Sequence, residues 1–396
     1  MRQENFFKFN KYQFISNSSI NNTNHTMSSS INKFCFQKIP VNILINLLNE
    51  GYTIDIIGIF PHFFEKYYFS LGYKDIVQVP FIYNKRLKKL NYIRPTFFIG
   101  KNFYNQKKII LSVPSGEDYI KHYTKIILHF LDIYFKNPKI LTNIYRSSYH
   151  EKNIMEITGF NNQFIFTNDI VILGYIDEIY DNLKDKLLLI SEQQNEYYIS
   201  KRCKINNKII NFLGIKYSYW GNISQKIIER LLKCKVKEII YSAKLGTLIS
   251  HLDIYSKIYS PSEYIIIEDL KIKTKKFKLE NKILKLFPFL NTQLHVSTPT
   301  ILEQTYKQRE FLSKMNVNSI DNEISQMAEV IYKKKLKVNF FSIHFPTDYL
   351  RKENERDLRT NFDLSNNRKS MAIFKKNKII KEISYYLYQY FMEETI

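Results

Sequence analysis

The chain has 396 residues, of which 44% are hydrophobic, and a formal net charge of +22. This length is typical of two domains or one large one, and the apolar content excludes a globally disordered chain. The odd number and wide spacing of Cys35, Cys203 and Cys234 argue against a disulfide framework or a zinc site. Without a run of ~20 apolar residues or a signal peptide, we expect a cytoplasmic protein with no cofactor and no metal.

The positive charge has two explanations. A charge of this size is typical of proteins that bind nucleic acid or an anionic membrane. Alternatively it reflects drift in an AT-rich genome, because Lys, Asn, Ile, Tyr and Phe are abundant while Gly, Ala and Pro are scarce. Most basic residues are scattered, and only Lys271–Lys278 and Lys333–Lys337 form short clusters. We favour drift, keep nucleic acid as the alternative partner, and expect no membrane partner.

The first part of the chain is predicted to be a disordered lead followed by an α/β domain. The lead covers residues 1–33, because Ser16–Ser30 is rich in Ser, Asn and Thr and lacks apolar periodicity. The domain covers 34–150, where strands are followed by tight turns and helices. Its predicted helices and strands are Val41–Gly51, Tyr52–Phe60, Lys108–Val113 and Tyr119–Phe135. The turn Ser115-Gly116 could hold an anion, or it is an ordinary strand-to-helix turn.

A second α/β domain is predicted over residues 165–396, after a polar, irregular boundary at Asn137–Phe160. Short β-branched runs alternate with amphipathic helices, which is typical of a largely parallel sheet covered on both faces. The predicted strands are Asp169–Leu173, Lys208–Leu213, Val236–Tyr241 and Val338–Ile343, and the clearest helices end at Cys234 and Lys334.

Three stretches of this second domain carry a family resemblance. They are the strand, acidic turn and helix DIVILGYIDEIYDNLKDKL at Asp169–Leu187, the glycine turns of Trp220–Leu248, and the helix start SIDNEISQMAEV at Ser319–Val330. In this order they resemble the nucleoside phosphorylase and nucleosidase superfamily, which includes methylthioadenosine/S-adenosylhomocysteine nucleosidase. The resemblance covers Asn168 to about Tyr349 and implies a central mixed sheet flanked by helices.

The resemblance implies roles for three carboxylates in cleavage of an N-glycosidic bond. Glu178 matches the acid that activates water, Glu323 the acid that binds ribose hydroxyls, and Asp348 the acid that protonates the leaving base. Each residue also has a plain interpretation, because first-turn acids stabilise helices and aspartates are common in turns. Asp321 stands where the family has the first Glu of its helix motif. We interpret His344 as a buried histidine with hydrogen-bond partners.

Other positions are implied to contact the substrate, and several depart from the family pattern. Ser224 and Gly246 lie in the two glycine turns and are assigned to substrate binding. Tyr241 replaces an arginine that holds phosphate, Lys244 replaces a serine beside it, and Asn322 replaces a methionine. The loss of the arginine favours hydrolysis over phosphorolysis, although Lys244 could hold a phosphate as a point charge.

These observations leave three hypotheses. The first is an enzyme that cleaves a nucleoside or nucleotide-like small molecule, the second an inactive module that senses a nucleoside, and the third a basic nucleic-acid-binding protein. Assembly into a homo-oligomer is compatible with all three. If the resemblance holds, we expect Glu178, Lys244, Glu323 and Asp348 to face one cleft at the carboxyl edge of one sheet.

Overall fold

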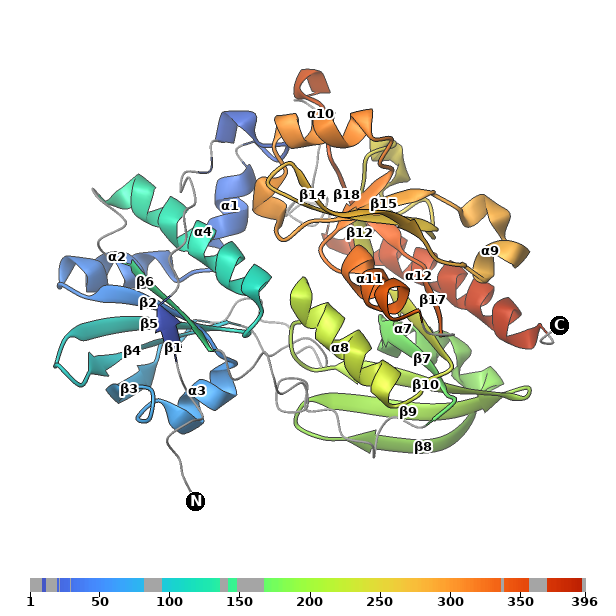
Figure 1. Ribbon diagram of the computed structural model, residues 1–396, viewed down its shortest axis with the longest axis horizontal. Helices are drawn as coiled ribbons and strands as arrows, with labels where there is room; N and C mark the ends of the chain where they lie inside the picture. Colours follow the sequence, from blue (N-terminus) through green and yellow to red (C-terminus); the bar gives the residue numbers. More distant parts are fainter. Residues whose placement is uncertain are drawn as a thin grey trace.

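The computed structural model shows an α/β protein built on three six-stranded sheets with helices packed against them (Figure 1). It describes residues 9–11, 20, 22–28, 30–81, 95–135, 142–147, 167–335, 338–355 and 369–393. The predicted α/β class is therefore confirmed. Most of the predicted boundary at Asn137–Phe160 lies outside the described residues. Within these residues, no helix combines the length and the apolar character that crossing a membrane requires.

The first sheet and its helices form what we call the N-terminal unit, which comprises the described residues up to Ser147. Strands β6, β2 and β5 are parallel, whereas β4 and β3 extend the sheet as antiparallel strands. Across the sheet the strands are β1 (Phe9–Lys11), β6 (Thr142–Ser147), β2 (Thr53–Gly58), β5 (Lys107–Val113), β4 (Thr96–Asn102) and β3 (Tyr73–Gln78). The helices are α1 (Ser30–Phe36), α2 (Val41–Asn49), α3 (Pro61–Tyr67) and α4 (Glu117–Tyr134).

The second sheet opens the C-terminal unit, which comprises the described residues from Thr167 onward. Its central strands are parallel, and β8 and β9 add an antiparallel edge. Across the sheet the strands are β17 (Asn339–Ser342), β11 (Glu238–Ser242), β7 (Ile170–Gly174), β10 (Lys208–Ile215), β9 (Tyr198–Ile205) and β8 (Leu188–Gln194). The helices around it are α7 (Ile176–Leu183), α8 (Asn222–Lys233), α11 (Ile324–Lys334) and α12 (Lys369–Met392).

The two faces of this second sheet belong to different hydrophobic clusters. Ile172 of β7 and Ile240 of β11 pack with α7 and α12, while their neighbours Val171 and Ile239 pack with α8 and α11. Successive side chains of a strand point to opposite faces, so α7 and α12 cover one face and α8 and α11 cover the other. This division decides which side chains can meet at the site described below.

A third sheet, which the sequence did not predict, lies beyond α11 (Figure 1). The chain passes into it twice, from β11 into β12 and from β17 into β18. Across the sheet the strands are β14 (Lys271–Lys278), β13 (Glu263–Glu268), β15 (Leu294–Ser297), β16 (Ser319–Asp321), β12 (Lys244–Thr247) and β18 (Phe345–Tyr349). The remaining helices are α9 (Ile283–Leu286), α10 (Tyr306–Lys314) and the 3₁₀ turns η2 (Asn22–Asn24), η4 (Lys184–Lys186), η5 (His251–Asp253), η6 (Pro288–Leu290), η7 (Ile301–Glu303) and η8 (Glu353–Glu355).

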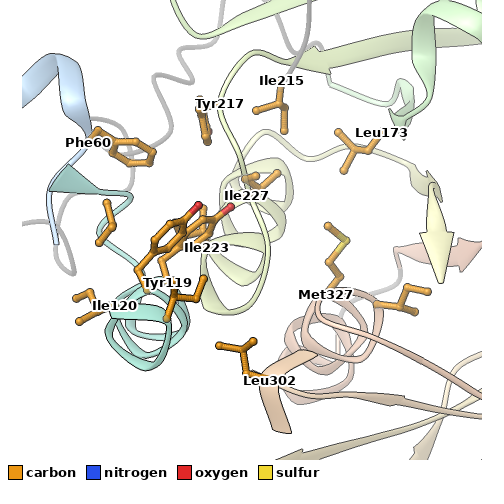
Figure 2. Close-up of a cluster of buried hydrophobic side chains, with 14 of the residues drawn as sticks. Phe60, Tyr119, Ile120, Leu173, Ile215, Tyr217, Ile223, Ile227, Leu302 and Met327 are labelled. Carbon is orange, nitrogen blue, oxygen red and sulfur yellow. The ribbon is translucent and has the colours of Figure 1, made fainter. Parts of the chain in front are cut away.

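The two units share one hydrophobic core rather than packing separately. Figure 2 shows Phe60 and Tyr119 of the N-terminal unit beside Tyr217 and Ile223 of the C-terminal unit. Helix α4 adds polar contacts across the same interface, because its residue Lys121 forms an ion pair with Glu268. The proposed division into domains at 34–150 and 165–396 thus separates the sheets but cuts through a continuous core.

Part of the expected disordered lead is ordered in the structure. Residues 22–28 pack against the C-terminal unit, and His25 and Thr26 are buried. The Arg351 guanidinium donates a hydrogen bond to the Thr26 carbonyl at 2.6 Å, and the Thr26 N–H donates to the Gln304 carbonyl at 2.9 Å. The expectation of disorder is wrong for this stretch, because these long-range partners satisfy a backbone that has little local apolar pattern.

Candidate functional site

A buried pair of carboxyl groups lies at the start of α11, where β16 ends. Asp321 accepts hydrogen bonds from the N–H groups of Glu323 at 3.0 Å and Ile324 at 2.9 Å. Its side chain therefore satisfies unpaired N–H groups at the start of α11 from two positions before Glu323, which occupies the N-cap position. The cap directs Glu323, the last residue before the helix, toward the carboxyl ends of the neighbouring strands.

A network of hydrogen bonds fixes the Asp321 carboxylate. His295 Nε2 lies 2.8 Å from Asp321 Oδ1, and Ser297 Oγ donates to the same oxygen at 2.6 Å. The other ring nitrogen, Nδ1, lies 2.8 Å from Ser319 Oγ. Burial acts to raise the pKa of Asp321, but His295 and Ser297 outweigh it and hold that pKa below its usual value. Asp321 is thus an ionised, fixed carboxylate.

The order Ser319–His295–Asp321 is that of a hydrolase triad, but its exposure argues against that role. His295 and Ser319 are both fully buried, since neither has any exposed surface. A nucleophilic serine must reach a substrate carbonyl, whereas this hydroxyl is enclosed between β15 and β16. We therefore assign the network to positioning Asp321.

Glu323 has the opposite protonation tendency. Burial and the adjacent negative charge of Asp321 raise the pKa of Glu323 well above its usual value. The N–H of Asn322 donates to Glu323 Oε2 at 3.2 Å, and the Asn322 side chain donates to the Thr298 carbonyl at 2.5 Å. Glu323 and Asn322 each keep a small exposed fraction. The site therefore combines a fixed carboxylate with a neighbouring carboxylic acid that keeps its proton.

Two tyrosines complete the surroundings of Glu323. Burial, followed by the negative charge of Glu323, raises the pKa of both Tyr219 and Tyr241. Their ring centroids lie 6.3 Å apart, and Tyr241 points from β11 toward the α8 and α11 face of the sheet. Both phenols stay protonated and present hydroxyl groups beside the carboxylic acid.

His344 lies next to Tyr241, and its surroundings differ in part from those predicted from the sequence. Its ring meets that of Tyr241 edge to face, with 4.8 Å between the centroids, and it has no exposed surface. Neither ring nitrogen has a hydrogen-bond partner among the described residues. Burial lowers the pKa of His344 to about 3, although the charge of Asp321 acts to raise it. The prediction of a buried histidine is right, but the prediction of hydrogen-bond partners is wrong.

The structure does not bring Glu178 to this pair. Glu178 Oε1 lies 2.8 Å from Lys376 Nζ on α12, and Glu178 remains partly exposed. Its helix packs on the α12 face of the second sheet, whereas α11 packs on the opposite face. Tyr175, the residue before α7, lies nearer to the carboxyl pair, since its phenol is one of the groups that raise the pKa of Tyr241. The Glu178 carboxylate therefore has an ion-pair partner on α12, and its assignment as the water-activating residue stays a prediction.

Lys244, Gly246 and Asp348 lie together in the third sheet. Parallel pairing of β12 with β18 places Gly246 opposite Asp348, and Lys244 opposite Phe345. Lys244 and Asp348 are partly exposed, whereas Gly246 is buried. A Cβ at Gly246 would lie 3.1 Å from side chains on either side, so close packing between strands explains this glycine. The assignment of Asp348 as the acid that protonates the base stays a prediction.

Ser224 and the glycine turn before α8 have structural partners. Ser224 is buried, and its hydroxyl donates to the Gly221 carbonyl at 2.6 Å. The N–H of Asn222 donates to Asp118 Oδ2 of the N-terminal unit at 2.9 Å. Gly221 has a φ of 61°, and a Cβ there would lie 2.3 Å from Asp118 Oδ2. Burial raises the pKa of Asp118 to about 7, against the opposing effects of Asn222 and Lys121.

Sequence reasoning missed the groups that organise the site. The pattern L-H-V-S at Leu294–Ser297 holds a usable signal, since His295 and Ser297 are two residues apart and share one face of a strand. Asp118 carries no such signal, because it lies 104 positions from the helix that it caps.

Comparison with known proteins gives limited similarity. No protein-family model matches the chain. The chain is 28% identical over 362 residues to a protein named oxidoreductase cns1 from Cordyceps militaris. That alignment covers 86% of this chain and 46% of the relative, so the chain spans about half the length of the curated relative it matches.

The chain is also similar to solved nucleosidase and phosphorylase structures. These include a mutant 5'-methylthioadenosine/S-adenosylhomocysteine nucleosidase of Helicobacter pylori with 5'-methylthioadenosine in its active site, at 16% identity and a TM-score of 0.41, covering 56% of this chain and 97% of that one. A futalosine hydrolase mutant of Helicobacter pylori is 15% identical with a TM-score of 0.42, and the match covers 56% of this chain and 97% of that one. Uridine phosphorylase from Vibrio fischeri is 12% identical with a TM-score of 0.43, and the match covers 57% of this chain and 91% of that one. Similarity at this level assigns neither an activity nor a residue role to this chain.

Proposed function

We propose that the C-terminal unit binds a nucleoside or nucleotide-like small molecule at the start of α11 and hydrolyses its N-glycosidic bond. The observation that carries the proposal is the pair of neighbouring carboxyl groups at the start of α11. His295 and Ser297 fix the Asp321 carboxylate by hydrogen bonds, while burial and that charge raise the pKa of Glu323. Tyr219 and Tyr241 face the same acid. The motif resemblance, which implies that Glu323 binds sugar hydroxyls, supports the same assignment.

The chemistry of glycosidic cleavage suits such a pair. As the bond between the sugar and the base breaks, its electrons leave with the base and positive charge develops on the sugar. That charge favours ionisation of Glu323, whose pKa is high only because of burial and the Asp321 charge. The interaction therefore strengthens as the transition state forms, which is the requirement for catalysis. The proton that Glu323 loses passes to the departing base, water adds to the sugar carbon, and the proton released by the added water restores Glu323.

Hydrolysis is favoured over phosphorolysis by two features of the site. Tyr241, which replaces the family's arginine, is buried and neutral, so it supplies no fixed positive charge for phosphate. The start of α8, where helix N–H groups could hold an anion, already binds the Asp118 carboxyl through Asn222. An incoming phosphate would have to displace this group of the protein itself.

A second candidate is a module that binds a nucleoside without cleaving it. The observation that favours it is the ion pair between Glu178 and Lys376, which holds the assigned water-activating carboxylate against α12. Under this alternative the site retains its contacts with sugar and base but lacks a residue that deprotonates water.

The name of the fungal relative suggests oxidoreductase chemistry, but no sequence motif here supports it. The ten glycines of the chain form no GxGxxG pattern, which is the usual fingerprint of dinucleotide binding at a strand-to-helix turn. We therefore treat oxidation or reduction as an outcome to be tested with NADH and NADPH rather than as a proposal.

Release of free base is the direct test. Purified full-length protein is incubated with adenosine, guanosine, inosine, uridine and cytidine, with and without phosphate, and free base is quantified by chromatography. We expect base release without phosphate, and about 10²-fold slower release by Glu323→Gln, which keeps the shape but removes the carboxyl group. The exposed Glu310→Gln is the control and should match the wild type.

The outcomes separate the candidates. A strict requirement for phosphate would refute hydrolysis. Nucleoside binding measured by calorimetry without any base release would instead support the sensing module. Absence of both binding and release for all five nucleosides would overturn the proposed function.

A further inference from the structure

His344 differs from the other buried histidines of the described chain in its hydrogen bonding. Five histidines are buried among the described residues: His25, His122, His129, His295 and His344. The first four each lie within hydrogen-bond distance of at least one protein group, at 2.6 to 3.1 Å. For His344, both ring nitrogens are enclosed and have no partner within the part of the chain that the structure describes. The partly exposed His62 shares this state, but His344 is the one of the two that has no exposed surface.

An unpartnered imidazole inside a protein is unfavourable. A neutral ring has one N–H donor and one nitrogen acceptor, and each group that is buried without a partner destabilises the folded chain. Native structures resolve such cases with an ordered water molecule or with a ligand. A phenylalanine of similar shape would avoid the cost altogether.

The position of His344 points to a ligand rather than to a separate internal site. His344 follows β17, and its neighbour Ile343 belongs to the cluster on the α7 and α12 face. His344 itself packs edge to face with Tyr241, which points to the α8 and α11 face. The charge of Asp321 acts on the His344 ring as well. The unpartnered ring therefore belongs to the same group of residues as the carboxyl pair.

We infer that His344 contacts the heterocyclic base of the bound nucleoside through a hydrogen bond at one of its two ring nitrogens. The inference rests on the proposed function, since it assumes that Glu323 binds the sugar of the same molecule. The two nitrogens of an imidazole point away from each other, so a base edge meets only one of them. A neutral ring can donate to a base acceptor or accept from a base amino group there, according to its tautomer.

The electrostatics of the ring define what it does. Because burial lowers the pKa of His344 to about 3, the ring is uncharged at neutral pH. It is therefore suited to recognising the base and holding its orientation, while the proton available at this site is carried by Glu323. His344 should affect affinity and base preference more than it affects the pH dependence of cleavage.

The test uses the nucleoside that binds best among the five named above, with affinity measured by calorimetry in phosphate-free buffer. We expect His344→Phe to weaken binding about tenfold or more, while the ligand-free variant is at least as stable to urea as the wild type. His344→Gln keeps a donor and an acceptor and should recover part of the affinity. The control is His129→Phe in the N-terminal unit, which removes a hydrogen bond to Asn32 and should lower stability but leave affinity within twofold.

A second measurement reads His344 directly. In protein labelled with ¹⁵N at histidine, the ring signals that are missing from His344→Gln belong to His344, and they should shift when the nucleoside is added. Suppose that the wild type binds a nucleoside, that His344→Phe binds it with the same affinity, and that the His344 ring signals do not shift. This result would overturn the inference while the proposed function stands. Wild-type protein that binds none of the five nucleosides would overturn the proposed function, and the inference with it.

Discussion

Asp118 gives the sharpest quantitative prediction. It lies on α4, is 7% exposed, and accepts a hydrogen bond from the N–H of Asn222 at the start of α8. Burial raises its pKa from 3.8 to about 7. The folded protein therefore binds a proton in a pH range where the unfolded chain has lost it. The stabilising contribution of the neutral acid is complete below about pH 4, and it is lost as the pH rises through about 7.

The magnitude follows from the shift in pKa. One pH unit corresponds to about 1.4 kcal/mol, so a rise of about three units destabilises the protein by up to about 4 kcal/mol once Asp118 is ionised. The positive end of the α8 dipole favours the carboxylate by about 0.3–2 kcal/mol, which makes this value an upper limit. Asp118→Asn removes the ionisation but retains an oxygen that can accept the Asn222 hydrogen bond. We expect this variant to exceed the wild type by about 2–4 kcal/mol at pH 8 and to differ little at pH 4.5.

Urea unfolding at the two pH values is the assay. The single tryptophan, Trp220, stacks on Tyr119 with 3.9 Å between ring centroids, so its fluorescence reports on the interface that Asp118 joins. Asp118→Ala is the matched control, because it removes the acceptor as well as the charge and should be about 1 kcal/mol less stable than Asp118→Asn at both pH values. A stability difference between Asp118→Asn and the wild type that does not change with pH would refute the reasoning.

Three further predictions concern single contacts. Gly221→Ala should lower the free energy of unfolding by about 1–3 kcal/mol, since the new Cβ would clash with Asp118 and φ is 61°; wild-type stability would contradict this. Lys376→Met should change stability by less than about 1 kcal/mol and leave base release unchanged, because its ion pair with Glu178 is partly exposed; a loss of turnover would return Glu178 to the site. Asp321→Asn should destabilise by about 1–3 kcal/mol in thermal or urea unfolding, because it weakens the buried hydrogen bonds with His295 and Ser297 and the capping of α11; wild-type stability would contradict this.

Local patterns were sufficient to predict the parallel strands of the second sheet. Asp169–Leu173 and Val236–Tyr241 correspond to β7 and β11 with boundaries shifted by at most two residues. These strands are buried on both faces, so each reads as a short β-branched run bounded by turn residues. The third sheet escaped prediction because its strands are short and its pairing is long-range. β16, for example, has three residues and contacts β12, which lies about 70 positions earlier.

The candidate site likewise contains residues that the sequence predicted and contacts that it did not. Glu323 was found because the helix start SIDNEISQMAEV at Ser319–Val330 resembles the family's helix motif. The groups that set its protonation came from elsewhere, since His295 is brought to Asp321 by the pairing of β15 with β16. Whether His344 would find hydrogen-bond partners also depended on packing against β11, which no local pattern encodes. Residue types at strand ends were predictable, whereas their contacts required the fold.

The contrast between Glu178 and Glu323 shows why the end of a strand alone does not place a catalytic residue. Both follow strand ends, yet α7 and α11 cover opposite faces of the second sheet. Ile176, Ile179 and Leu183 form the buried stripe of α7, and Glu178 lies off this stripe, so its side chain turns toward Lys376. Glu323 precedes the first helical residue, so the helix periodicity does not turn it outward. A carboxyl at the capping position is therefore held against the strand ends, whereas one inside the first turn follows the polar face of its helix.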